Sequence, residues 1–386
     1  RSSISYLTQV PPRTADSQRR RGHMWRALLV LIAPLASAAP LPEFTINLDL
    51  PPKERQRDVA LHFKDTYPGF MRAWEGFLSR KVSPEERAAW MENHHASQEL
   101  SDEIQGFVDA LGNEEVTFER LMLFNLMYEL NFPVFCSGIV AVDGQGRVLH
   151  GRNLDMVMTY RSGTNVMDVG SMFVNLTYVR NGTRVFNSHG IAGSVGANTA
   201  MKVDQRPWSI QHNSHFDNNR RKNLQALQEG AVPFSFVVRG LLQIEQIGFK
   251  EAVFLLSNTS FAAPSFFLMA GGGPWEGANL EIKRNSPDPV QNRVQVLAPQ
   301  VGRWFLVQTN DRIWDEPQDD RRNAAMQLVQ SVGTPFQMNE DAIMRIMRTA
   351  PLFNDYTAMS VVSVPSTGRV KSLSKDEYSP SVQLFA

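Results

Sequence analysis

Apolar side chains recur every three or four positions over residues 44–130, a spacing typical of amphipathic helices. Phe70, Trp74 and Phe77 fall on one face of such a helix. A further helix is predicted to start after Ser83, where a serine cap is followed by Pro84 and acidic residues, and to continue through "SPEERAAWMENHHASQELSDEIQGFVDAL". The first third of the chain is therefore predicted to be helical.

After Pro133 the pattern changes to short β-rich runs. "CSGIVAVD" and "RVLHGRN" are separated by the turn sequence "DGQG", and a second hairpin is predicted around Asn181-Gly182 in "MFVNLTYVRNGTRVFNSHG". The polar stretch 204–222 is interpreted as a loop. Helices are predicted in "FSFVVRGLLQIEQI", in "FKEAVFLLSN", near 322–332 and near 339–348. Strands are predicted in "SFFLMAGGG", "ANLEIKR", "RWFLVQTN" and "YTAMSVVSV". Because the strands come in hairpin pairs, the pattern favours an α+β fold of layered antiparallel sheets over a doubly wound parallel one.

The charge balance narrows the range of functions. The 386 residues carry 39 basic and 39 acidic side chains. A nucleic-acid binder normally has a basic excess on one face, so no nucleic-acid partner is expected.

The start of the chain has the features of a secretory signal. From Met24 a basic position is followed by an apolar run too short to span a bilayer and by Ala-Ser-Ala, so residues 24–38 are predicted to be a signal peptide. Residues 1–23 are interpreted as upstream sequence or a cloning remnant. Three glycosylation sequons agree with secretory entry, and their acceptors are Asn175, Asn181 and Asn258.

The chain contains a single cysteine, Cys136, at the head of a predicted strand. Such a thiol can pair between chains, lie buried as a small apolar residue, or act as a reactive group. If the two strands form a hairpin, Arg152 and Asp155 come close to Cys136, and a guanidinium favours the thiolate. A surface ion pair between Arg152 and Asp155 is the simpler alternative. A papain-type pairing with histidine is a further alternative, although the surroundings of Cys136 lack the papain pattern.

Several motifs, taken together, resemble the acid ceramidase and N-acylethanolamine acid amidase family, whose members are N-terminal-nucleophile hydrolases of the cholylglycine-hydrolase type. The matching segments are "FTINLDLPP", "CSGIVAVDGQGRVLHGRNLD", "GIAGSVGANTAMK", "RWFLVQTNDRIWDEPQDDRRNAA" and "APLFNDYTAMSVV". The resemblance implies an αββα sandwich, two antiparallel sheets between helical layers, preceded by a helical N-terminal α-subunit.

The resemblance also implies a self-processing site. The precursor would cleave itself between Phe135 and Cys136, dividing it into a helical α-subunit (39–135) and a catalytic β-subunit (136–386). Cys136 would become an N-terminal nucleophile whose own amino group, of pKa about 8, takes the thiol proton, so no metal or other cofactor is implied. The other catalytic positions of the family fall on Arg152, Asp155, Asn310 and Arg321.

Roles for three of these residues follow from that mechanism. Asp155 would hold the amine, and Arg152 would favour the thiolate. Asn310 would donate to the oxyanion, a contribution of roughly 3 kcal/mol in comparable sites.

The chain departs from the family pattern at three places. The family's usual Cys-Thr-Ser is here Cys136-Ser137-Gly138. A family glutamate is replaced by Ser214, which puts substrate positioning in doubt, and Asp311 replaces a family tyrosine.

The expected activity is a lysosomal or secreted cysteine amidohydrolase acting on linear amides of lipids. N-acylethanolamines are the favoured substrate because acid ceramidases of the family join their subunits by a disulfide, and a chain with one cysteine cannot do this and also keep the nucleophile. Ceramide is the alternative substrate, and a catalytically impaired relative or a bacterial-type bile-salt or penicillin amidase are further readings. Expected partners are the lipid amide, the second subunit of an α/β heterodimer and, transiently, a membrane surface. The Phe70–Phe77 helix and "FAAPSFF" (261–267) are candidates for that contact, although a core position is the favoured interpretation of both.

Overall fold

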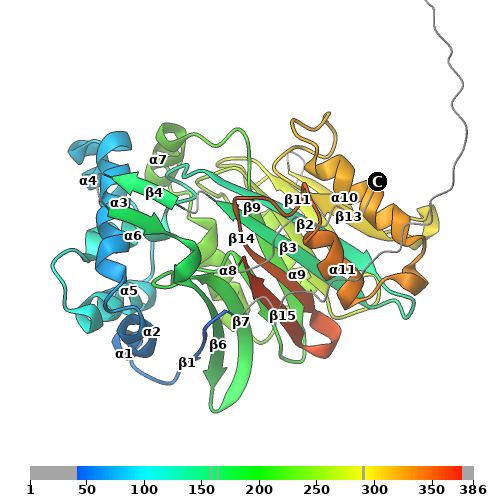
Figure 1. Ribbon diagram of the computed structural model, residues 1–386, viewed down its shortest axis with the longest axis horizontal. Coiled ribbons are helices and arrows are strands. Elements are labelled where there is room, and N and C mark those ends of the chain that lie inside the picture. The colour runs from blue at the N-terminus through cyan, green and yellow to red at the C-terminus, as the bar shows by residue number, and fades with distance from the viewer. Residues whose placement is uncertain (1–40, 157–158, 163–164, 289–291, 376–386) are drawn as a thin grey trace, which may run out of the picture. The chain divides into compact units, whose positions relative to one another are not determined.

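The computed structural model describes residues 41–375 except 157–158, 163–164 and 289–291 (Figure 1). The predicted signal peptide and the residues before it lie outside this range. The helices are α1 Pro52–Arg55, α2 Arg57–His62, α3 Tyr67–Lys81, α4 Pro84–Glu92, α5 Gln98–Leu111, α6 Phe118–Asn125, α7 Arg220–Gln228, α8 Phe234–Gln243, α9 Phe249–Ser257, α10 Arg321–Val332 and α11 Glu340–Met347. The strands are β1 Glu43–Asn47, β2 Val134–Val142, β3 Val148–Met156, β4 Thr159–Ser162, β5 Asn165–Asp168, β6 Phe173–Arg180, β7 Thr183–Ile191, β8 Thr199–Lys202, β9 Trp208–Ser214, β10 Ser265–Gly271, β11 Gly277–Ile282, β12 Arg293–Val296, β13 Phe305–Gln308, β14 Thr357–Val364 and β15 Arg369–Ser374.

Two sheets lie face to face between helices, which confirms the predicted αββα sandwich. One sheet has the order β1-β6-β7-β8-β9-β10-β11-β12 and the other the order β13-β2-β3-β14-β15. Helices α10 and α11 cover the five-stranded sheet, while α8 and α9 pack on the eight-stranded one (Figure 1).

Strand β2 lies inside this sandwich and is buried on both faces. Its side chains alternate between the sheets and the helices. Val140 belongs to the apolar cluster between the sheets, whereas Ile139 belongs to the cluster that α10 and α11 share with the five-stranded sheet. The predicted hairpin is confirmed, since β2 pairs with β3 antiparallel along its whole length.

The first third of the chain is not entirely helical, which corrects the prediction for residues 44–130. Strand β1 pairs in parallel with β6 and so extends the eight-stranded sheet. The single helix predicted after Ser83 is two helices, α4 and α5, separated by residues 93–97 with His95 at a φ of 51°. Ser97 caps the second helix by accepting from the Leu100 amide, a stop and restart that the sequence pattern alone did not reveal.

The apolar stripe of α3 is part of the core. Phe70 and Trp74 are buried, as is Phe77, and their rings pack on Phe124 and Phe132. Truncating a side chain such as Trp74 to alanine typically costs about 3–5 kcal/mol. "FAAPSFF" is likewise buried where it enters β10, so for both segments the core interpretation is confirmed.

The stretch 204–222 is not a loop throughout, which is a second correction. Its middle forms β9, an interior strand between β8 and β10, and its polar side chains are buried between partners. The polar composition of this stretch predicts exposure to solvent, whereas the side chains of β9 are buried. The residues in fact alternate, with Trp208 and Ile210 on one face and Ser209 and Gln211 on the other, and this period of two was the available signal.

Candidate functional site

The Cys136 thiol lies on β2 and is completely buried between the two sheets. Its Sγ is 3.4 Å from Arg152 Nη2 and 3.6 Å from the main-chain oxygen of His212. Arg152 extends from the neighbouring strand β3 and is itself held by that same oxygen at 2.7 Å. The predicted approach of Arg152 to the thiol is present in the structure.

Asp155 lies on the other face of the five-stranded sheet. In the β2–β3 register Cys136 faces Leu154, and Asp155 faces Phe135, so the Asp155 and Cys136 side chains point to opposite faces. The Asp155 carboxylate accepts from the Thr357 hydroxyl at 2.7 Å and lies 3.5 Å from Arg321 Nη1. The Asp155 carboxylate is therefore directed away from the thiol and toward Arg321, which in turn contacts the Cys136 carbonyl.

The Cys136 main chain is held at both its nitrogen and its oxygen. Its N–H donates to Asn310 Oδ1 at 2.9 Å, and its carbonyl accepts from Arg321 Nη1 at 3.0 Å. Arg321 Nη2 also donates to Asn310 Oδ1 at 3.0 Å. Arg321 begins α10 and Asn310 lies just after β13, so two neighbouring segments far along the chain from Cys136 converge on it.

The orientation of Asn310 differs from the predicted one. Both groups facing its Oδ1 are donors, so the oxygen and not the amide N–H points at Cys136. Its Nδ2 donates to the Ser214 carbonyl at 2.8 Å. In this uncleaved arrangement the Cys136 nitrogen, which Asp155 was expected to hold, is held by Asn310. The role of Asn310 as oxyanion donor stays a prediction.

Burial dominates the electrostatics of the thiol. It raises the pKa of Cys136, and the Arg152 guanidinium opposes this rise without overcoming it. Burial also raises the pKa of Asp155 to about 6, although the Thr357 hydroxyl and Arg321 act in the opposite direction. Arg152 therefore acts in the predicted direction, since it lowers the pKa of the thiol, but in the uncleaved chain burial outweighs it.

The bond predicted to be cleaved lies at the boundary between core and surface. Phe135 is 48% exposed and Cys136 is 0% exposed. The Phe135 ring lies 5.8 Å from the Arg321 guanidinium. On its other side, the thiol belongs to the apolar cluster that includes Phe132 and Val134, so the segment before the bond helps to close the site.

Ser214, the position of the missing family glutamate, ends β9 beside this site. Its hydroxyl is buried and has no hydrogen-bond partner among the described residues. A carboxylate is present two strands away: Glu281 on β11 accepts from Arg312 Nε at 2.8 Å and lies 3.5 Å from His215 Nε2. Glu281 sits on the face that looks toward the other sheet, whereas Ser214 looks away from it, so Glu281 does not occupy the place of the missing side chain.

No histidine side chain is hydrogen-bonded to Cys136 among the residues that the structure describes. The His212 ring stacks on Phe234 with centroids 3.6 Å apart, and its Nε2 contacts Ser265 Oγ at 3.1 Å. The papain-type alternative is thereby excluded for these residues. The His212 carbonyl, which holds both the thiol and Arg152, was missed in the sequence because main-chain acceptors have no residue signature.

The three sequons differ in accessibility. Asn181 is exposed at the β6–β7 turn, and Asn258 is partly exposed after α9. Asn175 is buried on β6, where its amide donates to Ser372 Oγ at 2.7 Å and its Oδ1 lies 2.6 Å from His189 Nδ1. The prediction of a glycan acceptor at Asn175 therefore disagrees with the folded structure, since Nδ2, the atom that would carry the glycan, is buried and hydrogen-bonded to Ser372.

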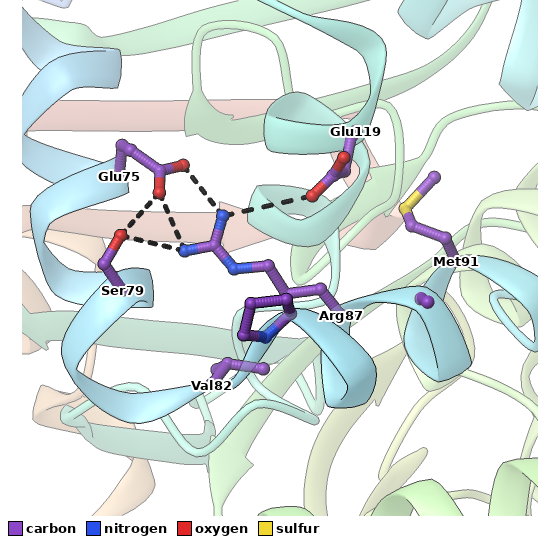
Figure 2. A pocket seen from close by; sticks show the side chains of 8 residues that line it. Glu75, Ser79, Val82, Arg87, Met91 and Glu119 are labelled. Atoms are coloured by element: carbon purple, nitrogen blue, oxygen red, sulfur yellow. Dashed lines mark hydrogen bonds and ion pairs between the residues drawn. The ribbon is translucent and has the colours of Figure 1, made fainter.

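A surface cavity of about 530 Å³ lies between α3, α4 and α6 (Figure 2). In it the Arg87 guanidinium donates to the Glu75 carboxylate at 2.7 and 3.1 Å and lies 3.9 Å from Glu119. None of the predicted site residues lines it, so the thiol is reached from elsewhere. Within the described ranges, no helix is long and apolar enough to cross a membrane, and no group of three His, Cys, Asp or Glu side chains could hold a metal ion.

Glu129, just after α6, is a further buried carboxyl. It precedes the predicted cleavage bond and accepts from the Phe234 amide at 3.3 Å, while its Oε2 has no hydrogen-bond partner in the described part of the chain. Burial raises the pKa of Glu129 to about 8. The folded chain therefore holds this proton over a pH range in which the unfolded chain has released it.

We expect Glu129→Gln to remove a pH-dependent part of the stability. Because the pKa is raised on folding, the contribution of Glu129 is most favourable below its unfolded value of 4.5 and declines as pH rises toward about 8. The measured quantity is the free energy of unfolding of the wild type minus that of Glu129→Gln. This difference should fall by a few kcal/mol over this pH range, because each unit of pKa shift corresponds to about 1.4 kcal/mol. Denaturant titrations at several pH values measure this difference.

The difference between the two proteins is the informative quantity. Burial lowers the pKa of His150 to about 3 and of His189 to about 4, and these groups weaken the fold as pH falls below the ordinary histidine range. That opposite slope is common to both proteins and cancels. Glu114→Gln, at an exposed position, is the matched control. A pH-independent difference for Glu129→Gln would contradict the expectation.

The chain is similar to known proteins over most of its length. Residues 39–84 match the family model described as the beta subunit of N-acylethanolamine-hydrolyzing acid amidase. The N-acylethanolamine-hydrolyzing acid amidase of Caenorhabditis elegans is 27% identical over 83% of this chain and 88% of its own length, and that of Rattus norvegicus is 28% identical over 88% and 92%. The acid ceramidase of Rattus norvegicus is 25% identical over 92% and 89%. A solved structure of the Caenorhabditis elegans ortholog superposes with a TM-score of 0.52 at 29% identity, covering 60% of this chain and 93% of that one.

Proposed function

We propose, for a chain that belongs to the acid ceramidase and N-acylethanolamine acid amidase family, that Cys136 is the nucleophile of a self-processing lipid amidase. One observation carries the proposal: every reactive atom of Cys136 has a partner suited to this chemistry. The thiol lies against Arg152, the main-chain nitrogen against Asn310, and the carbonyl against Arg321. A cysteine kept only for packing needs none of these three contacts.

In the processing step, Cys136 Sγ attacks the carbonyl carbon of Phe135. The Phe135–Cys136 C–N bond breaks, the Cys136 nitrogen takes the thiol proton, and a thioester joins Phe135 to Sγ. Water then hydrolyses that thioester, leaving a carboxylate on Phe135 and a free thiol and amine on Cys136. Asn310 and Arg321 would hold the main chain of Cys136 throughout, so the nucleophile and the new amine stay in register.

In turnover the same residue acts on a substrate amide. The α-amino group of Cys136 accepts the thiol proton as Sγ attacks the amide carbonyl, and then returns it to the leaving amine. The acyl thioester left on Sγ is hydrolysed by water to the carboxylic acid, which regenerates the thiol. Asp155 would compensate the charge of Arg321, and Arg152 would stabilise the developing thiolate.

The two fragments would stay together after cleavage. β1 pairs with β6, and Arg239 of α8 is ion-paired with Glu103 of α5 at 3.2 Å. Arg220 also pairs with Glu86 at 2.5 Å. Main-chain pairing, one buried ion pair and one partly exposed ion pair across the cleavage point support a heterodimer of residues 39–135 and 136–386, held without a disulfide.

We infer that N-acylethanolamines are the preferred substrates and that the enzyme works in the lysosomal lumen or outside the cell. The single cysteine supports the first inference, because a disulfide between the fragments of the ceramidase type would consume the nucleophile. Ceramide is the second candidate, which the similarity to acid ceramidase supports. A lipid substrate would bring the enzyme to a membrane surface only transiently.

The test is turnover of a matched pair of lipids by purified, cleaved protein at acid pH. N-palmitoylethanolamine and N-palmitoylsphingosine carry the same acyl chain on different amines. Faster release of palmitate from the ethanolamide supports the proposal, and faster release from ceramide selects the second candidate. Cleavage without turnover of either lipid, or of a fluorogenic N-acyl amide, would indicate an impaired relative and point to Ser214.

A further inference from the structure

A chain of buried polar side chains runs between the two sheets and ends at Arg152. His150 on β3 contacts Ser209 Oγ at 2.8 Å and Gln211 Oε1 at 3.1 Å. Gln211 Nε2 donates to Asn213 Oδ1 at 2.6 Å, and Arg152 Nη1 lies 3.5 Å from that same oxygen. All of these side chains are buried, so this hydrogen-bonded series lies inside the protein and not on a solvated surface.

Two main-chain carbonyls determine the direction of every hydrogen bond in this chain. Asn213 Nδ2 donates to the carbonyls of Gln308 and Thr309, at 3.0 and 2.8 Å, which leaves its Oδ1 for Gln211 and Arg152. Gln211 must then present Nε2 to Asn213 and Oε1 to His150. It follows that His150 carries its proton on Nε2 and accepts from Ser209 on Nδ1. Asn213 thus joins Arg152 to the segment that leads into Asn310.

Gly138 makes room for the Gln211 side chain. A Cβ added at position 138 would lie 2.2 Å from Gln211 Nε2 and 2.4 Å from its Oε1. Gly138 pairs with Arg152 in the β2–β3 register, so this space lies beside the site. The Gln211 side chain therefore requires a residue without a Cβ at position 138. Gly138 is also one of the places where this sequence departs from the family pattern.

We propose that Gln211, accommodated by Gly138, is a positioning residue that holds Asn213 and thereby sets the Arg152 guanidinium against the Cys136 thiol. Residues 138 and 211 form a size-matched pair: the space for one side chain exists because the other is absent. Gln211 touches neither the thiol nor the cleavable bond, and it acts through Asn213. The kinetic test of this inference rests on the proposed function. The titration of the Cys136 thiol, which reports how Arg152 is placed, does not depend on it.

The experiment compares five variants with the wild type. Gln211→Met keeps the volume and removes the hydrogen bonds, and kcat should fall roughly 10-fold to 100-fold, with KM changed less than about threefold. Gly138→Ala should reproduce that loss although Gln211 is present, because the added Cβ displaces the amide. Gly138→Ala combined with Gln211→Ala removes the clash and should recover thermal stability but not kcat. Thr199→Val removes a buried hydroxyl on the neighbouring strand that has no partner among the described residues, and should leave kcat unchanged.

Gln211→Glu gives a readout that packing alone would not move. A protonated carboxyl donates to Asn213 and accepts from His150 as the amide does, whereas an ionised one repels Asn213 Oδ1. This variant should approach wild-type kcat at acid pH and lose activity as pH rises, while Gln211→Met stays impaired at every pH. Recovery of kcat in the Gly138→Ala, Gln211→Ala double variant, or a Gln211→Glu profile parallel to the wild type, would overturn the proposal.

A measurement without substrate separates this inference from the proposed function. Because the chain has one cysteine, [3-13C]cysteine labelling gives a single resonance that reports ionisation of the Cys136 thiol. The pKa of that thiol should move upward in Gln211→Met and in Gly138→Ala, because Arg152 loses its contact with a fixed Asn213 Oδ1 and is held against the thiol less firmly, by the His212 carbonyl. An unchanged titration in both variants refutes the positioning role even if the wild type is active. If the wild type shows no turnover but the thiol pKa still shifts in both variants, the positioning role is supported and only the proposed function is refuted.

Discussion

Replacing Cys136 with alanine is expected to abolish both cleavage at Phe135–Cys136 and hydrolysis of lipid amides. The proposed mechanism uses the same sulfur for both reactions, and the sequence contains no second cysteine to take its place. At acid pH the wild type should yield fragments corresponding to residues 39–135 and 136–386 on a denaturing gel. Cys136→Ala should remain a single chain, with a mass spectrum that shows no new terminus at residue 136.

The control for Cys136→Ala must separate chemistry from folding. The substitution removes one buried sulfur from the apolar cluster, so the near-ultraviolet circular dichroism of the uncleaved variant should match that of the uncleaved wild type. Cys136→Ser keeps a weaker nucleophile and should cleave more slowly. Cleavage of Cys136→Ala at the same bond would assign that cut to another protease, and an uncut, inactive wild type would falsify the enzyme proposal.

Replacing Arg321 with methionine is expected to cause the second-largest effect, on maturation and on stability together. Its guanidinium contacts the Cys136 carbonyl, Asn310 Oδ1 and the Asp155 carboxylate. Removing it leaves the buried Asp155 carboxylate without its cation, and breaking a buried pair in this way costs about 3–5 kcal/mol. Cleavage should slow by a factor on the order of 100 because the main chain of Cys136 loses one of its two supports.

The pH dependence identifies the cause of the Arg321→Met effect. The pKa of Asp155 is already about 6 with Arg321 present, and loss of the cation raises it further. The carboxyl is then neutral in acid, so the destabilisation should be largest above this range and shrink as pH falls. Adding Asp155→Asn should restore stability at neutral pH without restoring cleavage. Arg321→Lys should not rescue cleavage, because one ammonium cannot reach the Cys136 carbonyl, Asn310 Oδ1, Asp155 and Asp319 together. A pH-independent loss that Asp155→Asn does not relieve would contradict this account.

Local patterns predicted the fold well wherever the period of the side chains matched their burial. The β2–β3 hairpin and the Asn181-Gly182 turn are examples, with φ angles of 49° and 71° at that turn. Strand β9 was missed because its side chains are polar and buried, and β1 because its parallel partner lies more than a hundred residues away. The alternation of polar and apolar residues predicts which side chains are buried only where the polar ones face solvent, and in β9 they do not.

The candidate site divides in the same way. The sequence by itself determined which residue carries the thiol, and the short β2–β3 hairpin brings Arg152 beside it, because antiparallel register converts sequence spacing into proximity. Only the tertiary structure decided that Asp155 lies on the opposite face, that Asn310 presents its oxygen, and that Gln211 occupies the space left by Gly138. These features depend on side chains from strands far apart in sequence meeting between two sheets. Their hydrogen-bond directions follow from main-chain carbonyls, which have no signature in the sequence.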